Sequence, residues 1–370
     1  MKRWGRRFEL ARALGLRHMV RRRRLGARFK QVSADEASHA EEMWVEAADA
    51  LGATVVRLSP TILEFQHGEA RTHVAFGATT PLTDNVAMEF AGDKPVAYRT
   101  LSAAGLPVPA HVTVDGRDVT DAQCFLRNVA PPVLVKPVVG ASGRGVVGGV
   151  RTMPQLQRAM REAGRYHRRV LVERQVEGDT FRLLFLEGKL LDVIRRSPPR
   201  ITGDGRSTVE ELLFAEYERR IAAGGEPVNK GFDVDIDVLV ALENAGLELR
   251  SVPLAGESFA VRAATNYSGP EETETVDPRR VRAIVEPARR AAALLGVRLA
   301  GVDIVTTDPS RALQETGGVI LEVNPLPGLA HHYDVADRSR ATLVAIPVLA
   351  HLLGIDPDLA RWSFVDTDTA

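Results

Sequence analysis

Cysteine is nearly absent from this sequence, and long apolar runs are absent altogether. The 370 residues contain one cysteine, Cys124, which excludes an intramolecular disulfide and a cysteine-based zinc cluster. No apolar stretch reaches the roughly 18 residues that cross a bilayer, and the N-terminus lacks the apolar segment of a signal peptide. We therefore expect no membrane span, a cytoplasmic location, and a buried structural thiol at Cys124.

Charge is unevenly distributed, although the whole chain is neutral. Residues 1–30 carry twelve Lys or Arg and one acid, so the remainder has 36 basic and 47 acidic residues. Such a basic arm can bind nucleic acid or anionic lipid, or it can dock as a helix on the acidic body or on a second subunit. We favour the docked or solvated arm, because no other segment resembles a nucleic-acid-binding motif. The sequence thus predicts no nucleic-acid partner and leaves a homo-oligomer open.

Length and apolar periodicity indicate three regions after the basic arm of residues 1–30. A small N-terminal α/β domain is expected at 31–92, a nucleotide-binding region at 93–180, and a third region at 181–370. The elements expected in the first two regions are a helix at 34–51, a strand at 54–58, a hairpin of 61–66 and 71–76, a helix at 94–104, and a strand at 111–114.

The third region is expected to contain a hairpin, further strands and several helices. Ser207 and Glu210 form a capping-box pattern before a helix that should run to about residue 222. A long helix at 277–295 is expected to kink or break at Pro287. The remaining elements expected are a hairpin of 181–186 and 190–195, helices at 235–244 and 338–353, and strands at 299–306 and 319–323.

Two apolar segments near the C-terminus contain oxygen-bearing side chains. The segment 301–305 contains Asp303, and 319–325 contains Glu322 and Asn324. Because successive side chains of a strand face opposite sides, Glu322 and Asn324 should share one face. Oxygen ligands on rigid strands suit Mg²⁺, which keeps several waters and is commonly shared with nucleotide phosphates. We predict a magnesium site here; the alternative is a polar strand end without a ligand.

A glycine-rich loop follows a strand that carries a lysine. The strand at 131–137 contains Lys136, and Gly140 to Gly145 follow closely. Glycines let backbone N–H groups approach phosphate oxygens, and a lysine adds a point charge. The loop matches neither common phosphate-loop pattern, because the lysine precedes it and a strand follows it. We predict a hairpin over phosphates, called here the glycine lid (residues 140–145), although an ordinary glycine-rich turn would explain the loop equally well.

The segment 170–182 gives the lysine and the glycine lid a context. An apolar strand ends in Glu173, passes through a short linker, and reaches Asp179 and Arg182. At this point the chain resembles the ATP-grasp superfamily, and more closely the ATP-grasp part of cyanophycin synthetases and related amino-acid ligases. The segments that carry the resemblance are 91–95, 135–137, 140–145, 172–182, 195–199, 202–209, 266–269 and 301–328.

The resemblance implies an α/β (α+β) fold of ATP-grasp type, in which two subdomains grip ATP. It also implies roles for single residues. The implied ATP contacts are Lys94, Lys136, Ser142, Gly143, Gly145, Glu173, Arg174, Val176 and Asp179. The implied catalytic residues are Arg182, Arg196 and Asn266, and the implied metal ligands are Asp303, Glu322 and Asn324. Many relatives carry an acid where this chain has Thr180, so ribose recognition is open between Asp179, Glu177 and a hydroxyl group.

The implied activity is an ATP-dependent carboxylate–amine ligase for amino acids or a short peptide, using ATP and Mg²⁺ with Mn²⁺ as a substitute. A phosphoryl group passes to a carboxylate, and an amine then attacks the acyl phosphate, which releases ADP and phosphate. A small-molecule kinase shares every nucleotide feature and is the alternative. A third hypothesis is a regulatory nucleotide-binding module without turnover. The presence of all the expected phosphate-binding and metal-binding residues argues against it.

Substrate contacts are expected next to the metal strands, at 266–269 and 327–333. His331 and His332 are either proton acceptors for the attacking amine or surface histidines. Relatives that polymerise cyanophycin carry a second, Mur-ligase-like domain, and the sequence ends at Ala370. We therefore expect a single condensation.

Overall fold

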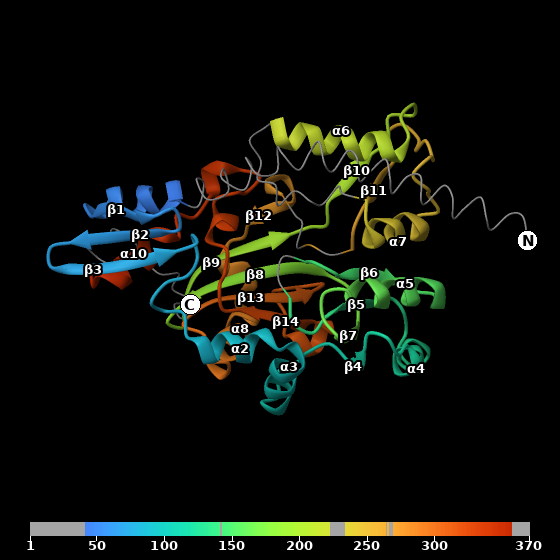
Figure 1. The fold of residues 1–370 in the computed structure, drawn as a ribbon, viewed down its shortest axis with the longest axis horizontal. Coiled ribbons are helices and arrows are strands. Elements are labelled where there is room, and N and C mark those ends of the chain that lie inside the picture. Colours follow the sequence, from blue (N-terminus) through green and yellow to red (C-terminus); the bar gives the residue numbers. More distant parts are fainter. Residues whose placement is uncertain (1–40, 141–142, 223–233, 264, 266–268, 357–370) are drawn as a thin grey trace, which may run out of the picture.

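The computed structural model describes residues 41–140, 143–222, 234–263, 265 and 269–356 (Figure 1). A five-stranded antiparallel sheet forms its centre, in the order β12-β9-β8-β13-β14. These strands are β8 (Asp179–Leu186), β9 (Lys189–Arg196), β12 (Thr273–Thr275), β13 (Leu299–Thr306) and β14 (Val319–Asn324). The predicted hairpin and the two predicted metal-bearing strands are therefore neighbours in one sheet.

Strand β8 shows why this sheet is covered on both faces. Phe181, Leu183 and Phe185 pack in one cluster with α2 (Asn85–Gly92), α3 (Lys94–Ala103) and α8 (Arg282–Leu294). Leu184 and Leu186 pack in a second cluster on the other face. Because side chains alternate along a strand, a run that is apolar at nearly every position needs cover on both sides.

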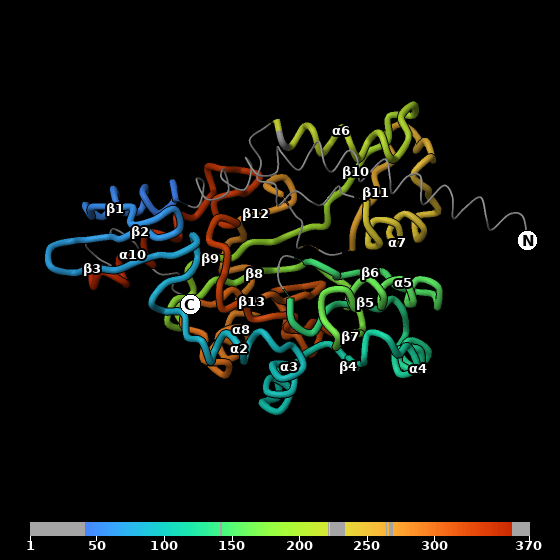
Figure 2. Tube along the Cα trace, viewed as in Figure 1, coloured from blue at the N-terminus to red at the C-terminus, as the bar shows by residue number. Residues whose placement is uncertain are grey.

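The N-terminal elements and the last helix cover the second face. A helix at 41–51 and the sheet β1 (Thr54–Ser59), β2 (Ile62–His67) and β3 (Ala70–Ala75) share that cluster with α10 (Ala345–Leu353). Figure 2 shows the blue N-terminal hairpin beside the red α10. Trp44 is fully buried there, and its Nε1 donates to the carbonyl of Gly77 at 3.0 Å. The domain boundaries inferred from the sequence stay predictions.

A second antiparallel sheet has the order β4-β7-β5-β6. Its strands are β4 (His111–Asp115), β5 (Val133–Pro137), β6 (Val147–Val150) and β7 (Arg169–Arg174), and its helices are α4 (Thr120–Asn128) and α5 (Met153–Ala163). Cys124 on α4 is exposed, so its expected burial is wrong. Ala122 and Leu126, one helical turn apart, face the core, and Cys124 lies between them on the opposite side.

A third unit follows β9, with β10 (Arg200–Thr202) paired to β11 (Ser258–Ala260) beside α6 (Val209–Ala222) and α7 (Ile236–Asn244). The capping box of α6 lies one residue later than predicted. Thr208 and Glu211 exchange hydrogen bonds at the helix start. Ser207 instead donates both its N–H and its hydroxyl group to Asp204 at 2.7 Å.

Two of the expected helices begin later than predicted. Helix α8 starts at Arg282, after a short 3₁₀ turn at Pro278–Val281, and continues through Pro287 without the expected break. Helix α10 starts at Ala345 rather than at 338. A 3₁₀ turn occupies Arg338–Arg340, and Thr342 after it donates to Asp192 on β9 at 2.9 Å. In the part of the chain that the structure describes, no helix is both long and apolar enough to cross a membrane. The mixture of helices and antiparallel sheets agrees with the predicted fold class.

Candidate active site

A buried ion pair joins the two central strands of the five-stranded sheet. Arg182 on β8 lies directly opposite Asp303 on β13. Its Nε and Nη2 atoms each donate to a carboxylate oxygen at 2.7 Å, and both side chains are less than a tenth exposed. Burial by itself would raise the pKa of Asp303, but the guanidinium outweighs burial and leaves that pKa below its ordinary value. Asp303 is therefore a charged carboxylate in the interior.

Strand β14 adds two further oxygen-bearing side chains. Glu322 pairs with Asp303 in the strand register, and Asn324 pairs with Gly301. The Nδ2 atom of Asn324 donates to the Gly301 carbonyl at 3.1 Å and lies 3.3 Å from the Asp303 carboxylate. The three predicted metal ligands thus lie in one patch where β13 and β14 meet.

Lys94 is the first residue of α3, and its side chain extends to this patch. Its Nζ lies 3.1 Å from Oε1 of Glu322. Asp93 caps the helix by accepting from the N–H of Val96 at 3.3 Å, and its other oxygen binds Arg169 at 2.6 Å. The capped helix start therefore fixes the point from which Lys94 extends, and Lys94 and Arg182 neutralise the two carboxylates of the patch.

Tyr98 connects this patch to the second predicted lysine. The Nζ of Lys136 donates to Glu173 at 2.8 Å and to the Tyr98 hydroxyl at 3.2 Å. That hydroxyl lies 3.0 Å from Glu173 and 2.8 Å from the carbonyl of Leu321, the residue before Glu322. Burial, then the charge of Glu173, raise the pKa of Tyr98 above its ordinary value.

The sequence reasoning missed Tyr98, although a signal was present. Tyr98 follows Lys94 by four residues on α3, and residues at that spacing share one helix face. If Lys94 extends from α3 toward the phosphate site, Tyr98, one helical turn later, extends toward the same region. The pattern alone could not reveal that Lys136 and Glu173 would be its partners.

Arg196 is a buried cation with an unsatisfied atom. It lies on β9, is 3% exposed, and its Nε has no hydrogen-bond partner within the described residues. Burial first, and then the positive charge of Arg182, lower the pKa of Arg196 to about 9. A buried guanidinium without full pairing is costly, so this position is suited to receiving an anion.

Known proteins are similar to this chain over much of its length. The family model described as D-ala D-ala ligase C-terminus matches residues 100–202. A cyanophycin synthetase from Nostoc sp. is 34% identical over 298 residues, which cover 79% of this chain and 32% of that protein. A bifunctional glutathione biosynthesis protein from Enterococcus faecalis is 27% identical over 290 residues, covering 75% of this chain and 37% of that protein.

A solved structure shows a similar fold. The bifunctional glutathione synthetase from Pasteurella multocida matches with a TM-score of 0.50 and 19% identity, over 82% of this chain and 42% of that one. Over these matched lengths the chain is similar to ATP-grasp ligases. It spans about a third of the length of the cyanophycin synthetases it matches.

In this chain the glycine lid connects β5 to β6. Gly143 and Gly145 have φ values of 65° and 73°, which glycine adopts without strain. A Cβ atom at Gly145 would also lie 2.6 Å from the ring of Tyr166, so a side chain there would collide. Ser142 and Asn266, a predicted ATP contact and a predicted catalytic residue, lie outside the described residues.

The segment between β7 and β8 carries the predicted adenine contacts. The N–H of Arg174 donates to the Ala110 carbonyl at 2.8 Å, and Val176 is half-buried. Gln175, between them, accepts from the N–H of Gly149 at 2.6 Å and so joins this segment to the strand that follows the glycine lid. Asp179 is exposed and binds Arg195 at 3.1 Å, so its carboxylate already has a partner. A ribose contact at Asp179 stays a prediction.

The two histidines that follow β14 differ. The Nδ1 of buried His332 lies 2.6 Å from the Asp192 carboxylate, a contact that holds the segment 329–332 against β9. His331 is half-buried, and its pKa is lowered by burial first and by the charges of Arg196 and Arg182 second. His331 is therefore a neutral imidazole near the cations of the site.

The patch on β13 and β14 fits a divalent cation only as a partial ligand set. Among the described residues, no group of three or more His, Cys, Asp and Glu is arranged to hold a metal ion. Asp303 and Glu322 supply two carboxylates, and the amide group of Asn324, whose oxygen could ligate a cation, lies beside them with its nitrogen toward Asp303. Such a set suits a hard cation that completes its coordination with water and phosphate oxygens.

Proposed function

We propose that this protein is an ATP-dependent carboxylate–amine ligase that forms an amide bond between amino acids or a short peptide. The observation that carries the proposal is Arg196, a buried and incompletely paired guanidinium on the strand next to Arg182. Together with Lys94, it surrounds a patch of carboxylates with cations. Cations and oxygen ligands at one point are what phosphoryl transfer to a carboxylate needs.

Two groups of residues are proposed to bind opposite ends of the nucleotide. Lys136, Glu173 and the 174–176 backbone are proposed to hold the adenine and the inner phosphates beneath the glycine lid. Lys94, Arg182 and Arg196 are proposed to bind the transferred phosphoryl group and the acyl phosphate. In the structure, Lys94 and Arg182 pair with Glu322 and Asp303, so they must be released from these carboxylates to contact phosphate.

A divalent cation is proposed to take over the charge balance at those carboxylates. Asp303, Glu322 and Asn324 would hold it, with Mg²⁺ preferred because its oxygen ligands suit this set and Mn²⁺ as a substitute. When bound, it would neutralise charge on the phosphates during transfer. His331, held neutral beside the arginines, would accept the proton of the attacking amine.

The kinase alternative has no observation of its own, because every nucleotide contact is shared with a ligase. A cytoplasmic location and a homo-oligomer remain predictions from the sequence. The identities of the acid and the amine depend partly on residues 266–268, which lie outside the described residues.

The reaction type is tested by trapping. Purified protein is screened against pairs of amino acids for ATP-dependent phosphate release, and condensed products are identified by mass spectrometry. Hydroxylamine should intercept the acyl phosphate and give a hydroxamate of the acid substrate, together with ADP and phosphate. Formation of AMP and pyrophosphate would indicate adenylation instead, and phosphorylation that needs no amine and yields a stable product would favour the kinase.

A further inference from the structure

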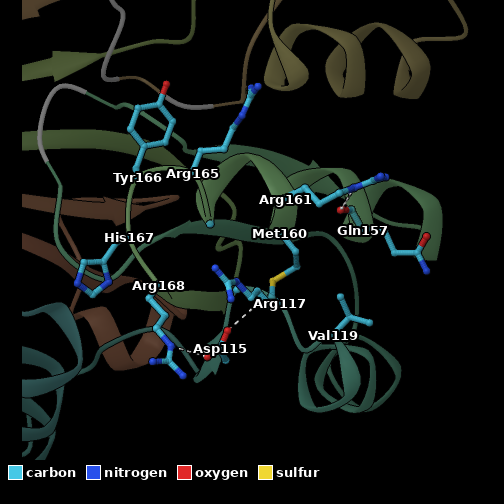
Figure 3. Close-up of a pocket in the computed structure, with 12 residues that line it drawn as sticks. Asp115, Arg117, Val119, Gln157, Met160, Arg161, Arg165, Tyr166, His167 and Arg168 are labelled. Carbon is cyan, nitrogen blue, oxygen red and sulfur yellow. Dashed lines mark hydrogen bonds and ion pairs between the residues drawn. The ribbon is translucent and has the colours of Figure 1, made fainter. Parts of the chain in front are cut away.

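A hollow lies where β4 and α5 end and β7 begins, and its lining contains no residue of the candidate active site. It has a volume of about 620 Å³ and is formed by the loop after β4, the second half of α5, and the segment 164–168 before β7 (Figure 3). None of its lining residues is a predicted contact of ATP, metal or substrate. Tyr166 at its rim packs against Gly145, so the hollow borders the glycine lid from outside.

The shape of the hollow is set by backbone contact. A Cβ atom on Gly116 would lie 3.0 Å from the Cα of Gly164, and the N–H of Gly116 donates to the Arg168 carbonyl at 2.8 Å. Two glycines at this crossing let the chain segments touch, while the longer side chains on either side leave space over the buried Met160. The base of the hollow is therefore formed by backbone segments in close contact.

Positive charge dominates the lining. Four of the twelve lining residues are arginines, and Asp115 is the only acid among them. The arginines are Arg117, Arg161, Arg165 and Arg168. Arg165 is paired with Glu162 at 2.9 Å. The guanidinium groups thus outnumber the carboxylates in contact with them by two, in a chain whose residues after 30 are acidic overall.

Asp115 contacts two of these arginines, only one of them through its guanidinium group. Its carboxylate accepts from the backbone N–H of Arg117 at 3.0 Å and from the Nε of Arg168 at 2.8 Å. Figure 3 shows both arginines beside it. These two contacts, in that order, lower the pKa of Asp115. The terminal amino groups of Arg168 and the whole guanidinium of Arg117 make no hydrogen bond with any residue that the structure describes.

Arg161 completes the arrangement. Its Nε donates to the backbone carbonyl of Gln157 at 3.1 Å, on its own helix, and it has no carboxylate partner in the described part of the chain. Guanidinium groups present pairs of N–H donors in a planar fork that matches phosphate and carboxylate oxygens. Arg117, Arg161 and Arg168 thus offer several such donors around one hollow of ligand size.

We propose that this hollow is an accessory binding site for a small molecule that carries two or more phosphate or carboxylate groups. Arg117, Arg161 and Arg168 bind its anionic groups, and Val119 contacts its carbon skeleton. The site is separate from the nucleotide site, and the proposal does not depend on the ligase assignment.

The test is isothermal titration of the full chain, without nucleotide, with inorganic tripolyphosphate and separately with citrate, at about 0.15 M ionic strength, where exposed charges are already screened beyond roughly 8 Å. The key variant is R117Q/R161Q, which leaves the contact between Asp115 and Arg168 intact. Its matched control is R71Q, which removes an exposed arginine from β3, at the opposite end of the molecule (Figure 1). A K94A/K136A variant disables the nucleotide site.

At least one of the two anions should bind, with affinity unchanged in R71Q and retained in K94A/K136A. In R117Q/R161Q the affinity should fall by about tenfold or more, because hydrogen bonds to charged groups are lost. Preference for tripolyphosphate or for citrate assigns phosphate or carboxylate chemistry. The proposal is overturned if neither anion binds, if R117Q/R161Q binds as tightly as the unmodified chain, or if binding disappears only in K94A/K136A.

Discussion

Among the residues that the structure describes, two aspartate–arginine pairs are buried, and the carboxyl groups of the two pairs have opposite pKa shifts. Asp303 and Arg182 lie in the central sheet, and Asp237 on α7 lies beside Arg262 under the strand that follows the glycine lid. Burial is nearly complete in both pairs. The pKa of Asp303 is nonetheless lowered, while the pKa of Asp237 is raised to about 6.

The geometry of each pair explains the difference. Arg182 aligns two N–H groups with both oxygens of Asp303 at 2.7 Å. Arg262 reaches Asp237 at only 3.4 Å, because it binds Asp235 more closely, at 2.8 Å. Burial therefore dominates at Asp237, and the negative charge of Asp235 raises its pKa further. Alignment of the guanidinium, rather than burial, decides whether an interior aspartate stays charged.

The two carboxyl groups also hold different partners. Asp237 accepts a hydrogen bond from the N–H of Gly148 at 2.8 Å, which fixes β6 against α7. A protonated carboxyl group can still accept that bond, so this position does not require charge. Asp303 lies beside Glu322 and Asn324, where a charged carboxylate is needed for the proposed role.

Breaking the first pair should have the largest effect. Asp303→Asn is expected to lower kcat/KM for amide formation by about 10²–10³-fold or more, because a charged group at the transfer site is lost. It also leaves Arg182 buried without its counter-charge, which costs about 3–5 kcal/mol. Glu322→Gln, at a side chain 26% exposed, tests the same patch with less risk to folding. Asp308→Asn in the loop after β13 is the control, and full activity in Glu322→Gln would contradict the site.

A third buried pair, Lys136 and Glu173, sharpens the comparison at the nucleotide end. Lys136→Ala should weaken ATP binding by about 10- to 100-fold, as expected for the loss of a charged hydrogen bond to phosphate. Direct titration with ATP measures this effect without needing turnover. Lys189→Ala, at the exposed start of β9, should leave the affinity unchanged. Equal affinities in the two variants would remove Lys136 from the site.

The second pair should show itself in the pH dependence of stability. Because the pKa of Asp237 is raised, the folded state keeps a proton that the unfolded chain loses near pH 4. The free energy of unfolding should therefore fall by roughly 3 kcal/mol as pH rises from about 4 to about 6. The lowered pKa of Asp303 changes stability in the opposite direction. Its stabilising contribution is present above the ordinary pKa of an aspartate and is lost as pH falls. Asp237→Asn should flatten the fall above pH 4, as measured by urea unfolding; an unchanged profile would refute the raised pKa.

An exposed pair near Asp237 should have the smallest effect. Arg158 on α5 donates to Glu243 on α7 at 2.7 Å, with both side chains partly in solvent. Arg158→Gln should change the free energy of unfolding by no more than about 1 kcal/mol, since exposed pairs gain little from Coulomb attraction. Chemical unfolding compares it directly with Asp237→Asn. If Arg158→Gln lowers the free energy of unfolding as much as Asp303→Asn is expected to, exposure does not explain the difference in strength between these pairs.

Much of the local structure could be predicted because its signals are local. The hairpin β2–β3 follows from alternation around Gly68, and the hairpin β8–β9 from two apolar runs around Gly188; both glycines have positive φ. The cap of α6 shows the limit of such signals. Ser207 and Thr208 are both suitable N-cap residues, and the choice depended on Asp204, which captures Ser207. Competition between neighbouring donors cannot be read from a pattern that considers one residue at a time.

The sequence by itself determined that two strands would carry Asp303, Glu322 and Asn324, and that a lysine would precede a glycine loop, because strand period and glycine conformational freedom are local properties. Only the tertiary structure decided which charges meet. Arg182 and Asp303 are 121 residues apart, and Tyr98 and Leu321 are 223 residues apart. The register of β8, β13 and β14 places such residues in contact, and the resulting geometry separates a charged Asp303 from a readily protonated Asp237. Those outcomes depend on electrostatics at distances of a few ångströms, which chain order does not encode.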